Sequence, residues 1–168
     1  MNNIPILTFV GRSGSGKTTF LEKLIRELTG RGYRLATVKH HSHSSFEIDC
    51  PGKDSWRFAQ AGSRHVVVAA PEKIASYRLL EHDLPLDEVV ADIKDVDLIL
   101  VEGYKQSGRD CIQVIRKEVS TDLVGDLQTT IAIVGNVPLD VPVPQLGLDD
   151  ITQAADLVED WLAKQKGS

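Results

Sequence analysis

A glycine-rich segment near the start of the chain, Gly11-Arg-Ser-Gly-Ser-Gly-Lys-Thr18, limits what the sequence can fold into more than any other feature. It follows a short apolar run at 4–10 and precedes a stretch whose apolar residues at 20, 21, 24, 25 and 28 share one helical face. The pattern Gly-x-x-x-x-Gly-Lys-Thr between a strand and a helix is typical of a P-loop, which wraps backbone N–H groups around phosphates. The sequence therefore predicts a bound nucleoside triphosphate at this turn.

Each residue type in this loop has a chemical reason. The glycines at 11, 14 and 16 permit backbone angles that turn successive N–H groups toward the phosphates. The N-terminus of the following helix adds its partial positive charge. We expect Lys17 to act as a catalytic cation on the β- and γ-phosphates, and the Thr18 hydroxyl to ligate Mg²⁺. The expected nucleotide-binding residues are Gly11, Arg12, Ser13, Gly14, Ser15, Gly16, Lys17, Thr18 and Thr19.

P-loop enzymes hold Mg²⁺ with a further acidic residue at the end of a neighbouring strand. The most apolar strand pattern in the chain runs from Val96 to Val101, and Glu102 and Gly103 follow it. Because ligands bind at the carboxyl ends of parallel strands, we expect Glu102 to act at the metal, as a ligand or by organising water. Asp49 is a second candidate metal ligand, although it also fits an ordinary loop carboxylate. Asp97 begins its strand and is expected to be structural.

Strand and helix patterns alternate along the chain. Beyond the opening pair, strand patterns lie at 34–38, 65–70, 96–101, 111–115 and 130–134, and helical patterns at 54–61, 85–93 and from 149 onward. We expect the run at 65–70, His-Val-Val-Val-Ala-Ala, to be a strand buried on both faces, whereas residues 73–80 fit a strand or a short helix. The alternation predicts an α/β fold, a three-layer P-loop NTPase with a mostly parallel sheet flanked by helices. Without a linker or repeat, residues 1–168 are expected to form a single domain.

The charge balance excludes one class of partner. The formal net charge is −5, so no excess of Lys and Arg is present to neutralise a nucleic-acid backbone. The apolar runs have the length of strands, and neither a membrane span nor a secretion signal is expected. The two cysteines, Cys50 and Cys111, form no Cys-x-x-Cys pair and fit reduced thiols in a cytoplasmic protein.

Two features of the sequence leave their chemistry open. Three histidines, at 40, 41 and 43, lie in a polar loop; contact with phosphate or a partner is favoured there over zinc binding, because Cys50 is the only nearby thiol. The Asn-Lys-x-Asp pattern that reads guanine is absent. Asn136 follows a predicted strand and fits either a base contact or a turn before Pro138. The residues by themselves therefore leave guanine and adenine equally open.

Several segments together point to one family. They are 9–19 (FVGRSGSGKTT), Val38-Lys-His40, Asp49-x-Pro-Gly-Lys-Asp-Ser-x-Arg57, Ala61-Gly62, Leu98-Ile-Leu-Val-Glu-Gly-Tyr-Lys105 and the closing Asp149-Asp-Ile. In these segments the chain resembles the molybdopterin-guanine dinucleotide biosynthesis protein B (MobB) family. The P-loop is shared with many families, whereas Pro-Gly-Lys-Asp-Ser after a histidine-rich loop is far more specific.

The resemblance implies a function. It implies a GTP-binding homodimer with weak intrinsic GTPase activity that uses Mg²⁺ and assists a MobA-like molybdopterin guanylyltransferase. That partner attaches GMP to molybdopterin, which would be a further ligand. The loops around His40 and Lys53 would then face phosphate, partner or cofactor. One departure is Gly135-Asn136, where the family resemblance leads us to expect a pair like Ser-Asp.

The alternative function is a small-molecule P-loop kinase that transfers the γ-phosphate to a metabolite hydroxyl. Asp49 would then serve as the base for the acceptor. An arginine-rich lid is missing, however, and Arg57 and Arg64 are the nearest candidates for one.

Intrinsic hydrolysis is expected to be slow. Tyr104 and Lys105 follow the Glu102-Gly103 turn where a water-positioning Gln would be expected, although Gln106 is close. The sequence also lacks an evident arginine finger, unless Arg12 reaches a phosphate within the chain or across a dimer.

Overall fold

The computed structural model describes residues 3–41 and 46–166. The chain forms two compact units, and each is described by itself. The main unit comprises Met1–His40 and Pro85–Ser168, and the second unit comprises His41–Leu84. The expectation of a single domain over 1–168 stays a prediction.

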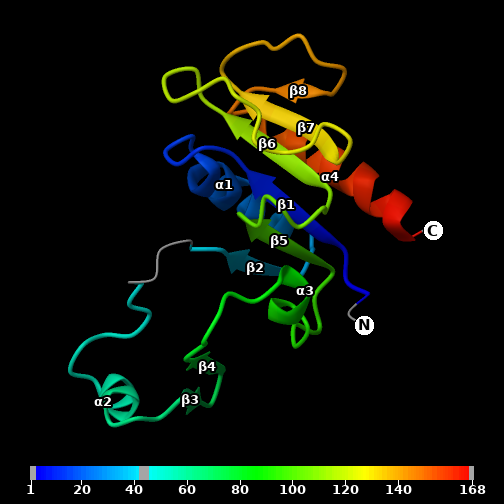
Figure 1. Cartoon of the computed structure of the whole chain (residues 1–168). Helices are drawn as coiled ribbons and strands as arrows, with labels where there is room; N and C mark the ends of the chain where they lie inside the picture. Colours follow the sequence, from blue (N-terminus) through cyan, green and yellow to red (C-terminus); the bar gives the residue numbers. More distant parts are fainter. Residues whose placement is uncertain (1–2, 42–45, 167–168) are drawn as a thin grey trace. The chain divides into compact units, whose positions relative to one another are not determined.

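The main unit is built around a six-stranded sheet. Its elements are β1 Ile6–Val10, α1 Lys17–Gly30, β2 Leu35–Lys39, α3 Leu86–Val89, β5 Leu98–Glu102, β6 Cys111–Ile115, β7 Thr130–Gly135, β8 Gln145–Leu146 and α4 Ile151–Lys166. The strand order is β2-β5-β1-β6-β7-β8, and every pairing is parallel (Figure 1). This arrangement confirms the α/β fold with a parallel sheet. The strand that carries the glycine-rich segment lies inside the sheet, between β5 and β6.

Alternate residues of the buried strands enter two separate cores, as the period of a strand requires. Leu7, Phe9 and Leu100 pack with α1 and α4 on one face of the sheet. Ile99 packs on the other face with Leu86 of α3. Helices therefore lie on both faces, and the three-layer prediction is confirmed. The helix predicted over 85–93 is only four residues long, and the two-residue β8 was not predicted.

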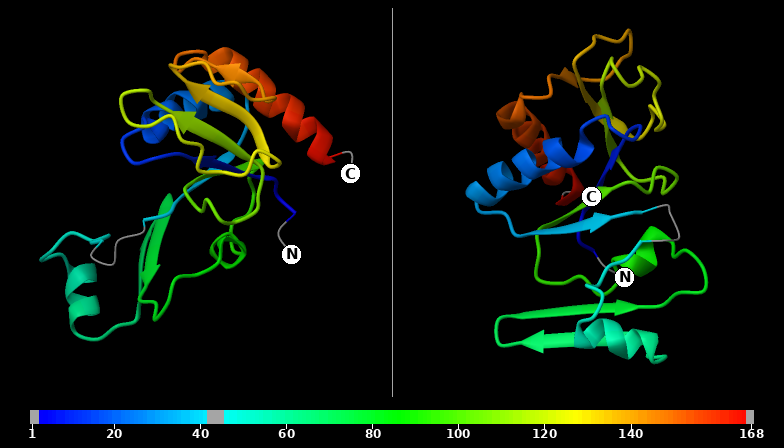
Figure 2. Two further views of the ribbon diagram at one scale, coloured as in Figure 1. Left: turned by 45° about the horizontal axis from the view of Figure 1, so that its top comes forward. Right: turned by 90° about the vertical axis from the view of Figure 1, so that its left-hand side faces the viewer.

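The second unit contains α2 Asp54–Gln60, β3 His65–Ala70 and β4 Lys73–Arg78. The two strands pair with each other in an antiparallel hairpin (Figure 2). The prediction that 65–70 is buried on both faces is wrong, because only Val66 in this strand is buried. A strand inside a parallel sheet has neighbours on both edges, whereas β3 pairs with β4 alone in a two-stranded sheet.

Within residues 3–41 and 46–166, no helix combines the length and apolarity that a membrane crossing needs. Both cysteines carry free thiols, with Cys50 exposed and Cys111 buried. Burial raises the pKa of the Cys111 thiol above its ordinary value, so this thiol stays protonated at neutral pH.

Candidate nucleotide-binding site

The glycine-rich loop leaves the carboxyl end of β1 and enters α1 at Lys17. The last residue before the helix, Gly16, has φ +92°, a backbone conformation that side chains disfavour. A Cβ there would also lie 3.3 Å from the guanidinium of Arg116. The first N–H groups of a helix have no intrahelical partner, and Gly16 brings no capping side chain. These donors face a cavity of about 390 Å³, which the loop shares with Lys39, Glu102 and Arg116.

The ammonium group of Lys17 lies over the loop. Its Nζ donates to the carbonyl oxygens of Gly11 at 3.0 Å and Arg12 at 2.8 Å. Burial lowers the pKa of Lys17 from its ordinary value, the Glu102 carboxylate opposes this shift, and Lys39 adds to it. A phosphate bound here would favour the charged form again. The lysine is therefore held where an anion in the cavity can reach it.

The predicted metal residues Thr18 and Glu102 lie together. The Thr18 hydroxyl donates to Oε2 of Glu102 at 2.8 Å. Parallel pairing of β1 with β5 places Glu102 opposite Phe9, so the carboxylate emerges level with the start of the loop. A hydroxyl oxygen beside a carboxylate is a donor set that Mg²⁺ prefers, so the residues present fit this ion. Asp97, at the opposite end of β5, pairs with Arg34 at 2.8 Å, as expected of a structural residue.

Asp49 belongs to the second unit and is held there by neighbours of its own. Its carboxylate accepts hydrogen bonds from the Tyr77 hydroxyl at 3.0 Å and the Cys50 backbone N–H at 2.8 Å. A hydrogen bond from Ser55, with help from these two donors, lowers the pKa of Asp49 despite some desolvation. Its place at the metal stays a prediction.

His40 packs against the turn that follows β5. Its backbone N–H donates to the carbonyl of Glu102 at 2.9 Å, and its ring lies 4.3 Å from that of Tyr104. Gly103, with φ +104°, makes room for it, because a Cβ there would lie 2.9 Å from Cβ of His40. His43 lies outside the described residues. Among those described, no group of three or more His, Cys, Asp or Glu side chains is placed to hold a metal ion.

Two cations at the cavity were not predicted as site residues. Lys39 ends β2, and its Nζ lies 3.3 Å from Oγ1 of Thr18 and 3.5 Å from the Glu102 carboxylate. Arg116 directly follows β6. Among the described residues that line the cavity, there are three cations, counting Lys17, and the single carboxylate of Glu102. The signal that identified Glu102, a polar residue at the carboxyl end of a strand, also marks Lys39 and Arg116.

Arg12 and Asn136, two further predicted residues, contact the segment that follows β6. Arg12 pairs with Asp122 at 3.4 Å on the surface. The Asn136 side chain accepts a hydrogen bond from the Lys117 backbone at 2.8 Å and donates to the Glu118 carboxylate at 2.9 Å. The hydrogen bond from Asn136 is the main reason that the pKa of Glu118 is lowered. Asn136 thus stabilises the turn that contains Lys117 and Glu118, and its contact with a base stays a prediction.

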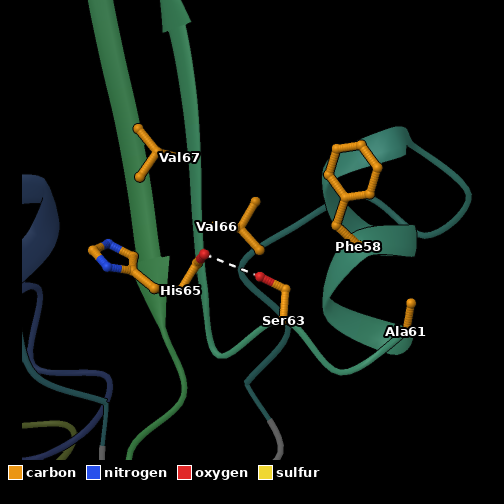
Figure 3. Close-up of a pocket in the computed structure, with 6 residues that line it drawn as sticks. All are labelled: Phe58, Ala61, Ser63, His65, Val66 and Val67. Atoms are coloured by element: carbon orange, nitrogen blue, oxygen red, sulfur yellow. Dashed lines mark hydrogen bonds between the residues drawn. The ribbon is translucent and has the colours of Figure 1, made fainter.

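A second hollow, of about 480 Å³, lies within the second unit (Figure 3). It is lined by Phe58, Ala61, Ser63, His65, Val66 and Val67. Val66 points toward the helix that carries Phe58, and the Ser63 hydroxyl donates to the His65 carbonyl at 3.0 Å. The described residues that line it include no carboxylate, lysine or arginine, so they offer little for a triphosphate.

Comparison with known proteins adds to this geometry. The family model described as molybdopterin guanine dinucleotide synthesis protein B matches residues 6–136. The chain belongs to this family. Its match spans the loop, β5 and the turn after β6, so the residues around the cavity all lie within the family's common region.

Individual relatives agree with the family match. The molybdopterin-guanine dinucleotide biosynthesis adapter protein of Haemophilus influenzae is 40% identical over 163 residues, which cover 96% of this chain and 91% of that protein. The protein of the same description from Escherichia coli is 37% identical over 171 residues, covering 98% and 97%. The crystal structure of Bacillus subtilis MobB superposes with a TM-score of 0.77 at 28% identity, covering 94% of this chain and 97% of that one. The P-loop NTPase fold predicted from the sequence is thereby confirmed.

Proposed function

We propose that this protein binds GTP with Mg²⁺ on Gly11 to Thr19 and acts as an accessory to the guanylyltransferase that converts molybdopterin to its guanine dinucleotide. The observation that carries the nucleotide part is the cavity in which Lys17, Thr18 and Glu102 meet the loop. The relatives named as adapter proteins of molybdopterin-guanine dinucleotide biosynthesis support the accessory part. We place this role in the cytoplasm as part of the proposal.

The roles of the residues follow from their chemistry. The loop N–H groups and Lys17 would hold the β- and γ-phosphates. Thr18 and Glu102 would hold Mg²⁺, with Asp49 as a further ligand. The ion would supply charge neutralisation between the two phosphates. Slow hydrolysis is expected, because Tyr104 follows Gly103 where a water-orienting side chain would be needed.

Nucleotide binding with and without Mg²⁺ tests the proposal. Wild type should bind GTP more tightly than ATP, and Lys17→Ala should lose at least about tenfold, or 1.4 kcal/mol. Glu102→Gln should weaken binding only when Mg²⁺ is present, and Asp49→Asn should do so if it reaches the metal. Calorimetric titration with a molybdopterin guanylyltransferase should detect a complex. Equal GTP and ATP affinities without a complex would contradict the accessory role, and phosphate transfer to a metabolite hydroxyl would favour a kinase instead.

We also propose that two copies associate through the hairpin of the second unit. Val67 on β3 and Ile74 on β4 are exposed, Ile74 to 72%, and they share one face of the hairpin because Ile74 pairs with Ala69, two residues after Val67. Contiguous apolar side chains on a two-stranded sheet are typical of an interaction surface. Sedimentation should give a dimer for wild type and a monomer for Ile74→Lys. A wild type that stays monomeric at micromolar concentration would contradict the dimer.

A further inference from the structure

Arg116 occupies an unusual position for an arginine. Its side chain lies against Gly16, where Nη2 is 3.3 Å from the place that a Cβ would take. Nε is buried and has no hydrogen-bond partner. Within the described residues, the guanidinium also forms no ion pair. A guanidinium is always charged, and a buried N–H without a partner is destabilising.

Two carboxylates that follow Arg116 in the sequence already have other hydrogen-bond partners, and Arg116 acts on one of them, Glu118, only through its charge, which helps to lower the pKa of that carboxyl. Glu118, two residues along, is engaged by the Asn136 amide at 2.9 and 3.2 Å. Asp122 is paired with Arg12 at 3.4 Å. The N–H donors of Arg116 are therefore available to a ligand that enters the cavity, which Arg116 helps to line.

The sheet order fixes the side from which Arg116 approaches. β1 pairs with β5 on one edge and with β6 on the other. Glu102 ends β5 and lies with Thr18, whereas Arg116 follows β6. The carboxylate and the guanidinium therefore flank the loop from opposite sides. A phosphate chain seated on the loop would meet the metal residues on one side and Arg116 on the other.

We infer that Arg116 is an anchor for the nucleotide's phosphate chain that acts independently of Mg²⁺. Its planar fork of donors suits the non-bridging phosphate oxygens that face away from the metal. This contact rests on the proposed nucleotide binding and deepens it. Because the contact is made in the ground state as well as during hydrolysis, it lowers KM and leaves kcat nearly unchanged.

The test compares Arg116→Met, Arg116→Lys and Glu102→Gln by titration with GTP and GDP, in Mg²⁺ and in EDTA. Arg116→Met keeps the packing against Gly16 without the charge, and it should weaken both nucleotides about tenfold in both buffers. Arg116→Lys should recover part of that loss. Glu102→Gln should weaken nucleotide binding only in the buffer that contains Mg²⁺. Arg26→Met, at an exposed position on α1, is the matched control and should leave affinity unchanged.

Two further measurements, steady-state GTP hydrolysis and thermal melting of the ligand-free protein, distinguish a phosphate anchor from a transition-state contact and from a purely structural role. KM should rise about tenfold for Arg116→Met with kcat within about threefold of wild type, and its Tm should equal or exceed that of wild type. A fall in kcat at constant KM would overturn the anchor and indicate a transition-state contact. A lowered Tm with unchanged affinity would overturn it in favour of a structural role. Unchanged affinity for Arg116→Met while Lys17→Ala loses binding would refute this inference alone, whereas a wild type that binds no nucleotide would refute the proposed function with it.

Discussion

The Gln113 side chain, at the centre of β6, is fully buried and makes four hydrogen bonds. Its amide oxygen accepts from the backbone N–H groups of Val124 and Gly125, both at 3.0 Å. Its amide nitrogen donates to the Gly125 carbonyl at 3.2 Å and to the Thr130 hydroxyl at 2.9 Å. One polar side chain thus fastens the loop between β6 and β7 onto the sheet. We predict that Gln113→Leu, which keeps the volume and removes the polarity, is strongly destabilising.

The magnitude follows from the groups left behind. Each neutral hydrogen bond is worth about 0.5–1.5 kcal/mol, and each buried group left without a partner adds about 1–3 kcal/mol. The loop around Val124 is half-buried, so water can reach some of the freed groups. We therefore expect a loss near 3 kcal/mol, below the full sum. For a chain of this size that corresponds to a Tm lower by about 6–12 °C.

Urea unfolding and calorimetry of wild type, Gln113→Leu and Gln128→Leu provide the measurement. Gln128 is exposed in the same loop and serves as the matched control, which should stay within about 0.5 kcal/mol of wild type. Gln113→Glu should be at least as destabilised as the leucine variant, because it buries a charge and loses both donated bonds. A loss below about 1 kcal/mol for Gln113→Leu would refute the reasoning, since the loop would then be held by other contacts.

Three further predictions concern the loop, the turn after β5 and the closing helix. Relative to Lys17→Met, the wild-type protein should gain stability as pH rises toward 10.5. The folded-state pKa of Lys17 is lowered, so the charged ammonium is unfavourable in the fold, and this cost disappears as the amine loses its proton; melting of both proteins across that pH range would reveal it. Gly103→Ala should lower the unfolding free energy by at least about 1–3 kcal/mol in urea titration, because its Cβ would lie 2.9 Å from that of His40 at φ +104°; a neutral result would mean that the turn relaxes. Trp161→Phe should be destabilising by about 1–2 kcal/mol in the same assay, since Nε1 donates to the Asp110 carboxylate at 2.7 Å; an unchanged midpoint would show that the bond contributes nothing.

The contact between Thr18 and Glu102 was predictable because two local rules converge on it. A P-loop follows its strand directly, and acidic residues at the ends of parallel strands meet the same edge of a sheet. Lys39 and Arg116 also lie at strand ends, so the same rule places them at the edge of the sheet where the loop lies. Neither lies in a short pattern as distinctive as Gly-Lys-Thr, and only the strand order reveals which side of the loop each one approaches.

The hairpin of the second unit shows what the sequence could not specify. The run at 65–70 has the composition of a strand inside a parallel sheet, yet β3 pairs only with β4. Apolarity indicates that a surface needs a partner, but it does not identify the partner. The two residues of β8 are likewise a strand only because β7 offers them a free edge. Pairing of this kind depends on tertiary contacts rather than on local pattern.

The position of β1 between β5 and β6 has a consequence for synthesis on the ribosome. Its residues pair with segments that begin at Leu98 and Cys111, about a hundred residues later in the chain. At about 5–20 residues per second, this apolar strand emerges several seconds before either neighbour exists. The glycine-rich loop cannot be held in place until then. Such long-range pairing slows folding, and it leaves the first strand without its sheet neighbours on the nascent chain during that time.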